Sequence, residues 1–366
     1  MIKKTDEYYM SLALKLALKA KGKTSPNPLV GALVVKKGKI VGKGFHARAG
    51  FAHAEIVALD EAGKNARGAT LYVALEPCAH TGRTPPCVNR IIQSGVKEVV
   101  VGMIDPNPLN NGKGILLLKQ SNIKVRLGVL SEQLRKINES FIKYISTGIP
   151  FVTVKVAESL DGRIATFTGE SKWITSDKSR LFAHKIRGDY DAIMVGVNTV
   201  LRDNPRLNAA SPQKQLVKII IDSNLSTPEN SNIFSGASRV IIITLPSRPG
   251  QETENRKSLS AKATILEVKE KDGQINLRDA FKKLARLKIS NIIVEGGGTL
   301  IGSLFDERLV DRILFFISPK IIGGKDAVSS VMGRGVKHPD QAIKLDKMKI
   351  RRFAEDLFIE ANVKST

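Results

Sequence analysis

The chain has 366 residues, which exceeds the roughly 250–300 residues at which one hydrophobic core stops growing, so two domains are expected. Hydrophobic residues make up 42% and charged residues 25%, close to globular averages, which excludes a disordered, collagen-like or coiled-coil chain. The formal net charge of +23 favours phosphorylated or polyanionic ligands. The basic residues are spread along the chain, however, and do not form the cluster typical of a nucleic-acid-binding arm.

Membrane and secreted proteins are also disfavoured. No stretch approaches 18 consecutive apolar residues, and Lys15 and Lys19 interrupt the first apolar segment, so neither a membrane span nor a signal-peptide core is predicted. The only two cysteines, Cys78 and Cys87, are too few for a disulfide-stapled secreted scaffold. We therefore expect a cytoplasmic protein with no membrane partner.

Strands and helices alternate along the first 147 residues. From Thr5 to Ala20 apolar residues recur at helical spacing, with Thr5 as a cap and Gly22 as a stop. A hairpin of buried strands (29–35 and 39–45) follows. The remaining predicted elements are a helix (54–62), a strand (69–75), a helix (87–94), a strand (96–102), a helix (113–121), a strand (123–129) and a helix (131–145). This alternation predicts a layered α/β domain with a partly parallel sheet.

A domain boundary is predicted where STGIP (146–150) ends the helical pattern, giving domains of residues 1–147 and 148–366. The second domain is also predicted to be α/β. Its expected strands are 151–157, 191–196, 217–222, 239–244, 264–268, 291–295, 311–318 and 349–361, and its expected helices are 176–188, 276–288 and 298–306. The polar, proline-containing stretch 246–262 is predicted to be a loop.

The first candidate site combines His53 and Glu55 with the two cysteines of EPCAHTGRTPPC (76–87). One imidazole and two thiolates fill three corners of a zinc tetrahedron and leave the fourth for a water whose pKa falls to about 7. Cys87 follows two prolines at a predicted helix start, where a thiolate is favoured. Glu55 is close enough to His53 to move a proton from that water to a departing amine.

Eight residues separate the cysteines, whereas the usual zinc-deaminase signature has two between them. The long spacing, together with TSPNPLVGALVV, GFHARAGFAHAE, LEPCAHTGRTPPC and VGMIDPNP in order, resembles the deaminase domain of the bifunctional riboflavin biosynthesis deaminase/reductases. The resemblance implies a cytidine-deaminase-like fold. It also implies substrate contacts at Asn27, His46, His80, Arg83 and Thr84.

Simpler interpretations of these residues remain open at this point. His53 could be a satisfied surface histidine, and the cysteines could be inert thiols or a disulfide. Asp105 and Asn107 of DPNP are predicted to form a plain turn.

The second candidate site is IIVEGGGTLIGSLF (292–305). A buried strand ends on Glu295, three glycines follow, and a helix begins near Thr299, which favours pyrophosphate binding at exposed backbone N–H groups. The G-x-G-x-x-G fingerprint is absent because Ile301 stands at the third glycine position. Together with KVAESLDGRIA, SKWIT and DAIMVGVNTVLRDNPRLN, the segment resembles the reductase half of the same family, which implies a dihydrofolate-reductase-like fold that uses NADPH.

The resemblance also implies ligand contacts in this domain. The implied cofactor contacts are Ala157, Trp173, Thr199, Asp203, Ser223, Gly297, Gly298, Thr299, Leu300, Ile301, Gly302 and Ser303. The implied substrate contacts are Ser171, Arg187, Leu207 and Glu295, with Lys155 as a further one. The alternatives are that Trp173 packs in the core and that Arg187 and Asp203 form a solvated ion pair.

One departure from the family pattern concerns phosphate binding. Asn208 and Ala210 stand where the family usually has Thr and Arg, so a phosphate-binding cation is missing. Arg187, Lys185 or Arg206 could replace it.

The function implied by the resemblance has two steps. The first is zinc-dependent hydrolytic deamination of 2,5-diamino-6-(5-phosphoribosylamino)pyrimidin-4-one, and the second is NADPH-dependent reduction of its ribosyl group to ribityl. The resemblance also suggests a homo-oligomer. The alternative is a nucleic-acid (tRNA) editing deaminase with an appended binding module. The cysteine spacing, the spread of basic residues and an aromatic content of only 5% count against nucleic acid as a partner.

Overall fold

The computed structural model describes residues 5–81, 85–211, 213–246 and 254–364. The chain divides into two compact units, Met1–Gly148 and Ile149–Thr366. Each unit has its own sheet and its own hydrophobic core, so each is described by itself.

The first unit is built on a five-stranded sheet with the order β2-β1-β3-β4-β5. β1 pairs antiparallel with β2 and β3, whereas β3, β4 and β5 are parallel. Its strands are β1 (Gly31–Lys36), β2 (Lys39–Phe45), β3 (Thr70–Leu75), β4 (Glu98–Met103) and β5 (Lys124–Leu127). Its helices are α1 (Asp6–Leu18), α2 (Ala54–Ala62), α3 (Cys87–Ser94), α4 (Lys113–Gln120), α5 (Ser131–Ile137) and α6 (Glu139–Thr147). The predicted partly parallel layered domain is confirmed.

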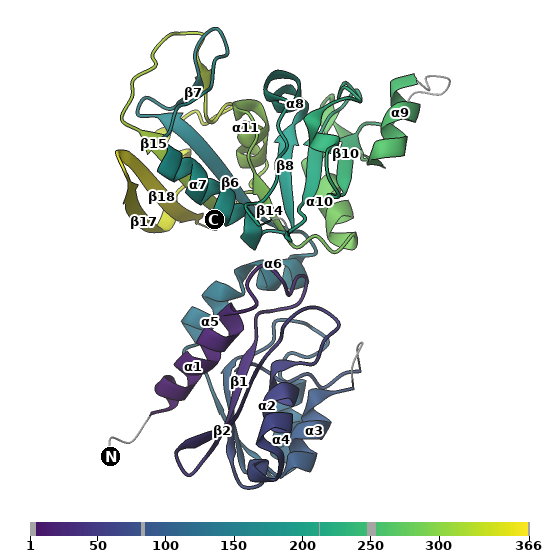
Figure 1. Ribbon diagram of the computed structural model, residues 1–366, viewed down its shortest axis with the longest axis vertical. Helices are drawn as coiled ribbons and strands as arrows, with labels where there is room; N and C mark the ends of the chain where they lie inside the picture. Colours follow the sequence, from purple (N-terminus) through teal and green to yellow (C-terminus); the bar gives the residue numbers. More distant parts are fainter. Residues whose placement is uncertain (1–4, 82–84, 212, 247–253, 365–366) are drawn as a thin grey trace. The chain divides into compact units, whose positions relative to one another are not determined.

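Helices cover both faces of this sheet (Figure 1): α1 and α5 lie on one face and α2, α3 and α4 on the other. Glycines allow the closest contacts. A Cβ atom on Gly31 would lie 2.0 Å from the carbonyl oxygen of Ala13 in α1. On the opposite face, a Cβ on Gly44 would lie 2.3 Å from the carbonyl oxygen of Ala54 in α2. The start of α2, where His53 and Glu55 lie, is therefore pressed directly against β2.

The predicted helix 131–145 is instead two helices, because Asn138 leaves the helical conformation between α5 and α6. The Asn138 side chain accepts a hydrogen bond from the Leu29 N–H at 2.7 Å and donates to the Leu29 carbonyl at 3.1 Å. A distant backbone contact thus decides where the helix breaks. Thr5 caps α1 as predicted, because its side chain accepts a hydrogen bond from the Tyr8 N–H.

The second unit is built on a nine-stranded sheet with the order β11-β10-β9-β8-β14-β6-β15-β18-β17. Its strands are β6 (Phe151–Ser159), β8 (Ala192–Gly196), β9 (Val217–Ile221), β10 (Val240–Thr244), β11 (Thr264–Glu267), β14 (Asn291–Val294), β15 (Arg312–Ser318), β17 (Leu345–Phe353) and β18 (Asp356–Val363). All neighbouring pairs are parallel except β15–β18 and β17–β18. Two small ribbons pair β7 (Arg163–Ala165) with β16 (Val328–Ser329), and β12 (Glu270–Lys271) with β13 (Gln274–Ile275).

Alternate residues of the buried strands face two separate cores. Ile219 and Ile241 pack with α10 (Leu277–Arg286) and α11 (Gly298–Asp306), whereas Ile220 and Ile242 face the opposite side. That side is covered by α7 (Asp177–Ile186), α8 (Val197–Asp203) and α9 (Glu254–Lys262). The parallel strands β8, β9 and β14 end at one edge of the sheet, the edge where ligands bind in open α/β folds.

Three predictions for this unit were wrong in detail. The stretch predicted as a loop contains helix α9. Its sequence is polar, and Leu259 is its single fully buried apolar residue, so no helical apolar pattern is visible. The predicted strand 349–361 is a hairpin of β17 and β18 that turns at Ala354 and Glu355. Helix α8 was missed because its seven residues, between Gly196 and Asn204, were interpreted as part of a motif.

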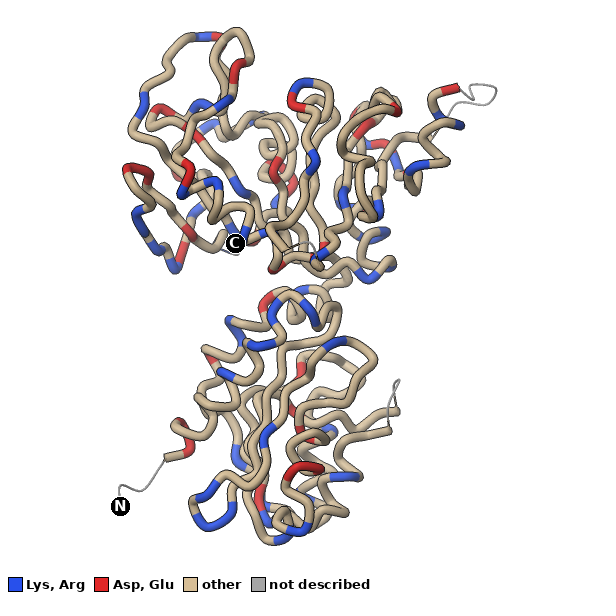
Figure 2. Tube along the Cα trace, viewed as in Figure 1, with Lys and Arg blue, Asp and Glu red and all other residues tan. Residues whose placement is uncertain are grey.

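No helix among the described residues is long and apolar enough to cross a membrane. Lys and Arg are distributed over both units, with Asp and Glu among them (Figure 2).

Candidate active sites

Three potential metal ligands from distant parts of the first unit lie together. His53 immediately precedes α2, Cys87 is the first residue of α3, and Cys78 lies in the loop after β3. Their ligand atoms all lie within 4.8 Å of one another. His53 Nδ1 is 3.1 Å from Cys87 Sγ and 3.7 Å from Cys78 Sγ.

The 3.7 Å between His53 Nδ1 and Cys78 Sγ matches the spacing of zinc ligands, and the 3.1 Å to Cys87 Sγ is somewhat shorter. Ligand atoms about 2.0–2.3 Å from a tetrahedral ion lie about 3.5–3.8 Å from one another. Both cysteines are free thiols, so the disulfide alternative is wrong. A hydrogen bond with Cys87 lowers the pKa of the Cys78 thiol against the opposing effect of burial, which favours its thiolate form. An imidazole and two sulfurs are the donor set that zinc prefers.

Glu55 is a buried carboxyl group beside this cluster. It lies in the first turn of α2 and is only 3% exposed. Burial raises its pKa, while the nearby His53 acts in the opposite direction. A carboxyl group with a raised pKa next to a metal site is suited to accept and return a proton.

His46 lies edge-to-face with His53, with ring centroids 5.4 Å apart. Burial lowers the pKa of His46, so the ring is neutral at pH 7. Its Nδ1 donates to the Ala52 carbonyl at 3.1 Å, which leaves Nε2 to accept from Asn27 Nδ2 at 3.1 Å. Two of the predicted substrate contacts are thus joined next to the metal cluster.

His80 is the remaining predicted deaminase contact that can be placed. It follows Cys78 by two residues, and its buried Nδ1 has no hydrogen-bond partner in the described part of the chain. Arg83 and Thr84 lie outside the described residues.

Asn110 was missed by the sequence reasoning. This fully buried side chain accepts from the Ala79 N–H at 2.9 Å and donates to the Pro77 carbonyl at 3.3 Å, so it holds the backbone on both sides of Cys78. Asn107 N–H donates to Asp105, as expected for the predicted turn. No motif could have identified Asn110, because its partners are about 30 residues away.

Glu76, next to the same loop, was also missed. Its buried carboxylate accepts from four backbone N–H groups, those of Asp105, Gly112, Gly114 and Ile115, at 3.0–3.3 Å. It thereby caps the start of α4 and ties the 105–112 loop to the segment that carries Cys78.

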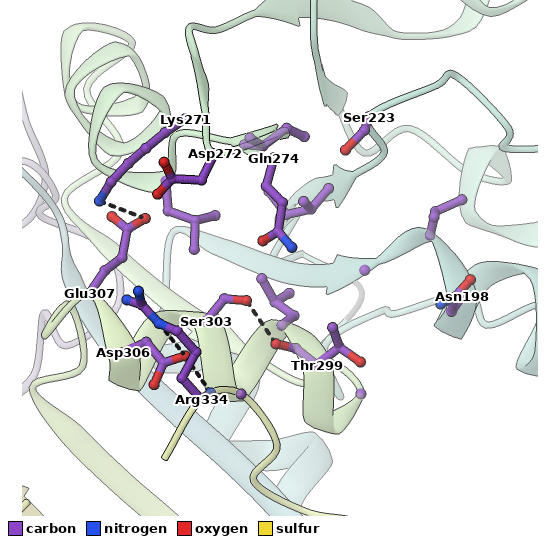
Figure 3. A pocket seen from close by; sticks show the side chains of 18 of the residues that line it. Asn198, Ser223, Lys271, Asp272, Gln274, Thr299, Ser303, Asp306, Glu307 and Arg334 are labelled. Carbon is purple, nitrogen blue, oxygen red and sulfur yellow. Dashed lines mark hydrogen bonds and ion pairs between the residues drawn. The ribbon is translucent and has the colours of Figure 1, made fainter. Parts of the chain in front are cut away.

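The second unit has a cavity of about 590 Å³ at the carboxyl edge of its sheet (Figure 3). Its lining includes six of the predicted cofactor contacts: Thr199, Ser223, Gly297, Thr299, Leu300 and Ser303. The first turns of α8 and α11 line the cavity, and the unpaired backbone N–H groups there favour binding of a phosphate.

The other predicted glycine-segment contacts have different surroundings. A Cβ on Gly298 would lie 2.2 Å from the Ser329 carbonyl, and one on Gly302 would lie 1.8 Å from the Met332 carbonyl. These glycines therefore admit the 329–333 backbone, not only a ligand. Ile301 is 1% exposed and belongs to the core.

Glu295 is the centre of a buried ion cluster. Arg187 Nε and a second guanidinium nitrogen bind its two carboxylate oxygens at 2.7 and 2.9 Å, and Lys155 Nζ lies 3.0 Å away. Burial alone would raise the pKa of Glu295, but Lys155 and Arg187 outweigh it and hold the pKa well below its usual range. The alternative that Arg187 forms a solvated ion pair with Asp203 is wrong, because Arg187 is buried and pairs with Glu295. Arg187 also donates to the Asn208 carbonyl at 2.9 Å.

The remaining predicted reductase contacts are dispersed. Trp173 is 63% exposed, so the core alternative is wrong, and the Arg180 guanidinium lies 4.2 Å from the centroid of its ring. Leu207 is buried and Asp203 is exposed at the end of α8. Ser171 and Ala157 are half-buried.

Comparison with known protein families agrees with both sites. Residues 3–103 match the cytidine and deoxycytidylate deaminase zinc-binding region. Residues 150–359 match the RibD C-terminal domain. This second match assigns the second half of the chain to a reductase. The nucleic-acid-editing alternative needed that half as a binding module, so the match counts against it.

Similar proteins extend over the whole chain. The riboflavin biosynthesis protein RibD of Aquifex aeolicus is 44% identical over 98% of this chain and 99% of its own. That of Escherichia coli is 40% identical over 87% and 89%. Among solved structures, RibD of Acinetobacter baumannii has a TM-score of 0.88 at 34% identity, with 98% and 99% of the two chains covered. A diaminohydroxyphosphoribosylaminopyrimidine deaminase/5-amino-6-(5-phosphoribosylamino)uracil reductase of Thermotoga maritima has a TM-score of 0.84 at 35% identity and the same coverage.

The fold, the metal cluster and the matches define a two-domain enzyme, a zinc-binding deaminase joined to an NADPH-dependent reductase. The chain belongs to the RibD family of bifunctional riboflavin biosynthesis proteins.

Proposed function

We propose that the first unit hydrolyses an exocyclic amine from 2,5-diamino-6-(5-phosphoribosylamino)pyrimidin-4-one, and that the second unit reduces the ribosyl group of the product to ribityl. The observation that carries the proposal is the cluster of His53, Cys78 and Cys87 with buried Glu55 beside it. The relative from Thermotoga maritima, which is named for these two activities, supports the choice of substrate.

In the deaminase, His53, Cys78 and Cys87 hold zinc. When bound, zinc acts as a Lewis acid and makes water nucleophilic at neutral pH. Glu55 takes the proton from the attacking water and passes it to the leaving amine, which departs as ammonia. Asn27 presents an amide to the pyrimidine edge, and its contact with His46 fixes its orientation. Arg83 and Thr84 bind the substrate phosphate.

In the reductase, the cavity along α11 holds NADPH, which supplies a hydride when bound. With NADPH bound, the bond between the anomeric carbon and the ring oxygen would break, the hydride would go to that carbon, and the oxygen would take a proton from solvent. Glu295 contacts the substrate, and Lys155 and Arg187 keep it ionised and fixed in one orientation. Ser171 and Leu207 complete the substrate contacts.

Glu55→Gln tests the deaminase assignment. We expect ammonia release to fall by about 10²–10⁴-fold, the usual contribution of proton transfer by a positioned group. Zinc content, measured by elemental analysis, should stay at the wild-type level because Glu55 is not a ligand. Ammonia release is measured with the pyrimidine phosphate, followed by NADPH absorbance.

Glu61→Gln, an exposed change in the same helix, is the matched control and should leave both activities unchanged. If Glu55→Gln retained wild-type ammonia release, the proposed proton transfer would be wrong. NADPH oxidation with the deaminated intermediate should persist in the variant.

The proposal also covers location and assembly. Free cysteines at a metal site suit a reducing compartment, which supports a cytoplasmic location. Self-association is proposed from the family resemblance, and light scattering of the purified protein tests it.

A further inference from the structure

Lys218 is a lysine that lies completely inside the second unit. It is on β9, between Ile193 of β8 and Val240 of β10, and its exposed fraction is 0%. Burial lowers its pKa, because an ammonium group loses its hydration there. No carboxylate of the described residues pairs with Lys218 to offset this cost. A lysine without a counter-ion is rarely buried, so the group it holds must account for its position.

The ammonium group of Lys218 holds a short turn of the chain. Its Nζ donates to the backbone carbonyls of Ile233 at 2.9 Å and Ser235 at 3.2 Å. These carbonyls belong to the 3₁₀ turn η3 (Asn232–Phe234) and to the residue that follows it. Hydrogen bonds from a charged donor are stronger than those between neutral groups. The buried cation therefore fixes the position of η3 from inside the core.

The same turn contacts the segment that follows α8. The Asn232 N–H donates to Asn204 Oδ1 at 2.7 Å, and Asn232 Nδ2 donates to the Asn204 carbonyl at 3.2 Å. Asn204 ends α8 in the left-handed conformation, with a φ of 42°. The next residue of the turn, Ile233, is buried in the same core cluster as Leu207. A hydrogen-bonded contact and a shared core thus connect η3 to residues 204–207.

Leu207, the predicted substrate contact in this segment, has a backbone conformation that leucine rarely adopts. Its φ is 54°, in the left-handed region. A residue keeps such a conformation only when its surroundings fix it, and residues of this kind cluster at ligand sites. On the other side of Leu207, Arg187 donates to the Asn208 carbonyl at 2.9 Å while it binds Glu295. The segment is therefore held at both ends, by Asn232 before Leu207 and by Arg187 after it.

We propose that Lys218 is a positioning residue of the reductase. Because it is fully buried, it contacts neither ligand. It fixes η3, and η3 keeps residues 204–208 in the conformation that presents Leu207 to the substrate. When one end of the segment is released, the strained backbone of Leu207 relaxes, so loss of Lys218 weakens substrate binding. This inference rests on the proposed substrate site.

Lys218→Met tests the proposal in the full chain. Methionine has a similar length but donates no hydrogen bond, and it removes the cost of the buried charge, so only a small change in stability is expected. The KM for the deaminated pyrimidine phosphate should rise about tenfold, the scale of one lost charge-assisted hydrogen bond. The kcat and the KM for NADPH should each change less than about twofold, because the lost interaction acts on substrate binding. NADPH absorbance measures all three.

Two controls separate positioning from general destabilisation. Lys218→Arg keeps a long cationic donor and should hold the KM within about threefold of the wild-type value. Val240→Ala, on the neighbouring strand of the same core, removes buried methyl groups but no hydrogen bond to η3. It should lower stability and leave the KM unchanged. An equal rise in KM for Lys218→Met and Val240→Ala would overturn the proposal.

A second variant breaks the same connection at the surface and keeps the test valid if Lys218→Met folds poorly. Asn204→Gly suits the left-handed conformation but removes the oxygen that accepts from Asn232, so the KM should rise about threefold. Both changes release the same segment, so the double variant should be no worse than Lys218→Met alone. A double variant whose KM rises by the product of the two single effects would contradict the shared connection.

Hydrogen exchange distinguishes this inference from the proposed function, because it requires no substrate. Amides of peptides that span residues 204–210 should exchange about tenfold faster in Lys218→Met and no faster in Val240→Ala. If the wild type reduces the pyrimidine and Lys218→Met does so with the same KM, the proposed function stands and the positioning role fails. If the wild type does not reduce it, the reductase proposal fails, and exchange alone decides whether Lys218 holds the segment. Unchanged exchange in Lys218→Met would then reject that role.

Discussion

Glu295 illustrates how a single residue acquires its character from residues distant in sequence. It lies on the strand-to-helix connection after β14, whereas its partners come from β6 and from the turn after α7. The sequence indicated a substrate contact but gave no sign that Lys155 and Arg187 would both bind the same carboxylate. Their combined field holds the pKa of Glu295 below its usual value although the group is buried.

This lowered pKa predicts a pH-dependent contribution to stability. The folded state binds the Glu295 proton less tightly than the unfolded chain does, so its stabilisation is complete above the usual pKa of about 4.5 and is lost as the pH falls through the lower folded value. Glu295→Gln should therefore destabilise the reductase unit by about 3 kcal/mol at pH 7, because it leaves two buried cations without their anion. The difference from wild type should shrink below pH 4. Urea unfolding at several pH values measures it.

Glu355→Gln, in the exposed turn between β17 and β18, is the control and should show no difference at either pH. A gap between wild type and Glu295→Gln that stays constant from pH 7 to pH 3 would contradict the ion-cluster assignment.

At the scale of elements, the contact of α2 with β2 positions the deaminase site. Gly44 is a point of close approach near the start of α2, since any Cβ there would meet the Ala54 carbonyl at 2.3 Å and the Ala58 nitrogen at 2.7 Å. These are backbone atoms of the helix that carries Glu55, so they cannot move without moving the site.

Gly44→Ala should therefore displace α2 and disturb the deaminase more than the reductase. We expect a loss of about 1–3 kcal/mol of stability in the first unit, the usual cost of overpacking, with reduced zinc retention during chelator competition. Gly188→Ala is the matched control, because a Cβ at that position meets no atom within 4 Å. Unchanged zinc retention and deaminase activity in Gly44→Ala would show that α2 tolerates the displacement.

Errors in the predicted elements arose where tertiary contacts outweigh local patterns. Asn138 breaks one predicted helix because the Leu29 backbone satisfies its side chain. Helix α9 has almost no apolar face. Burial of Leu259 in the second unit's core and hydrogen bonds from Asn255 to the Leu225 carbonyl and from Lys262 to the Glu229 carbonyl hold it in place. Long periodic segments such as α1 and α10 were predicted correctly, since their sequence spacing alone specifies a buried face.

At the scale of the whole molecule, each unit has its own core and its own cofactor. The metal cluster lies entirely within the first unit and the cavity entirely within the second. Ligand binding stabilises the unit that holds it.

Cofactor removal should therefore act on different unfolding transitions. Chelation of zinc should lower the Tm of the first unit by several degrees, and NADPH should raise that of the second, because binding free energy adds to the folding free energy of the binding unit. Differential scanning calorimetry of the full chain, with zinc restored as the control, measures both effects. If the chelator shifted only the transition that responds to NADPH, the assignment of the metal to the first unit would be wrong.

The sequence by itself determined the two α/β domains, the zinc-ligand candidates with Glu55, and the family, because helical and strand periodicity and short motifs depend on neighbours along the chain. Only the tertiary structure decided which side chains meet. Asn110 forms hydrogen bonds with the backbone next to Cys78, and Glu295 forms ion pairs with Lys155 and Arg187. Lys271 lines the cofactor cavity. Each of these contacts joins residues far apart in sequence. Such contacts follow from the packing of whole layers, which no local pattern specifies.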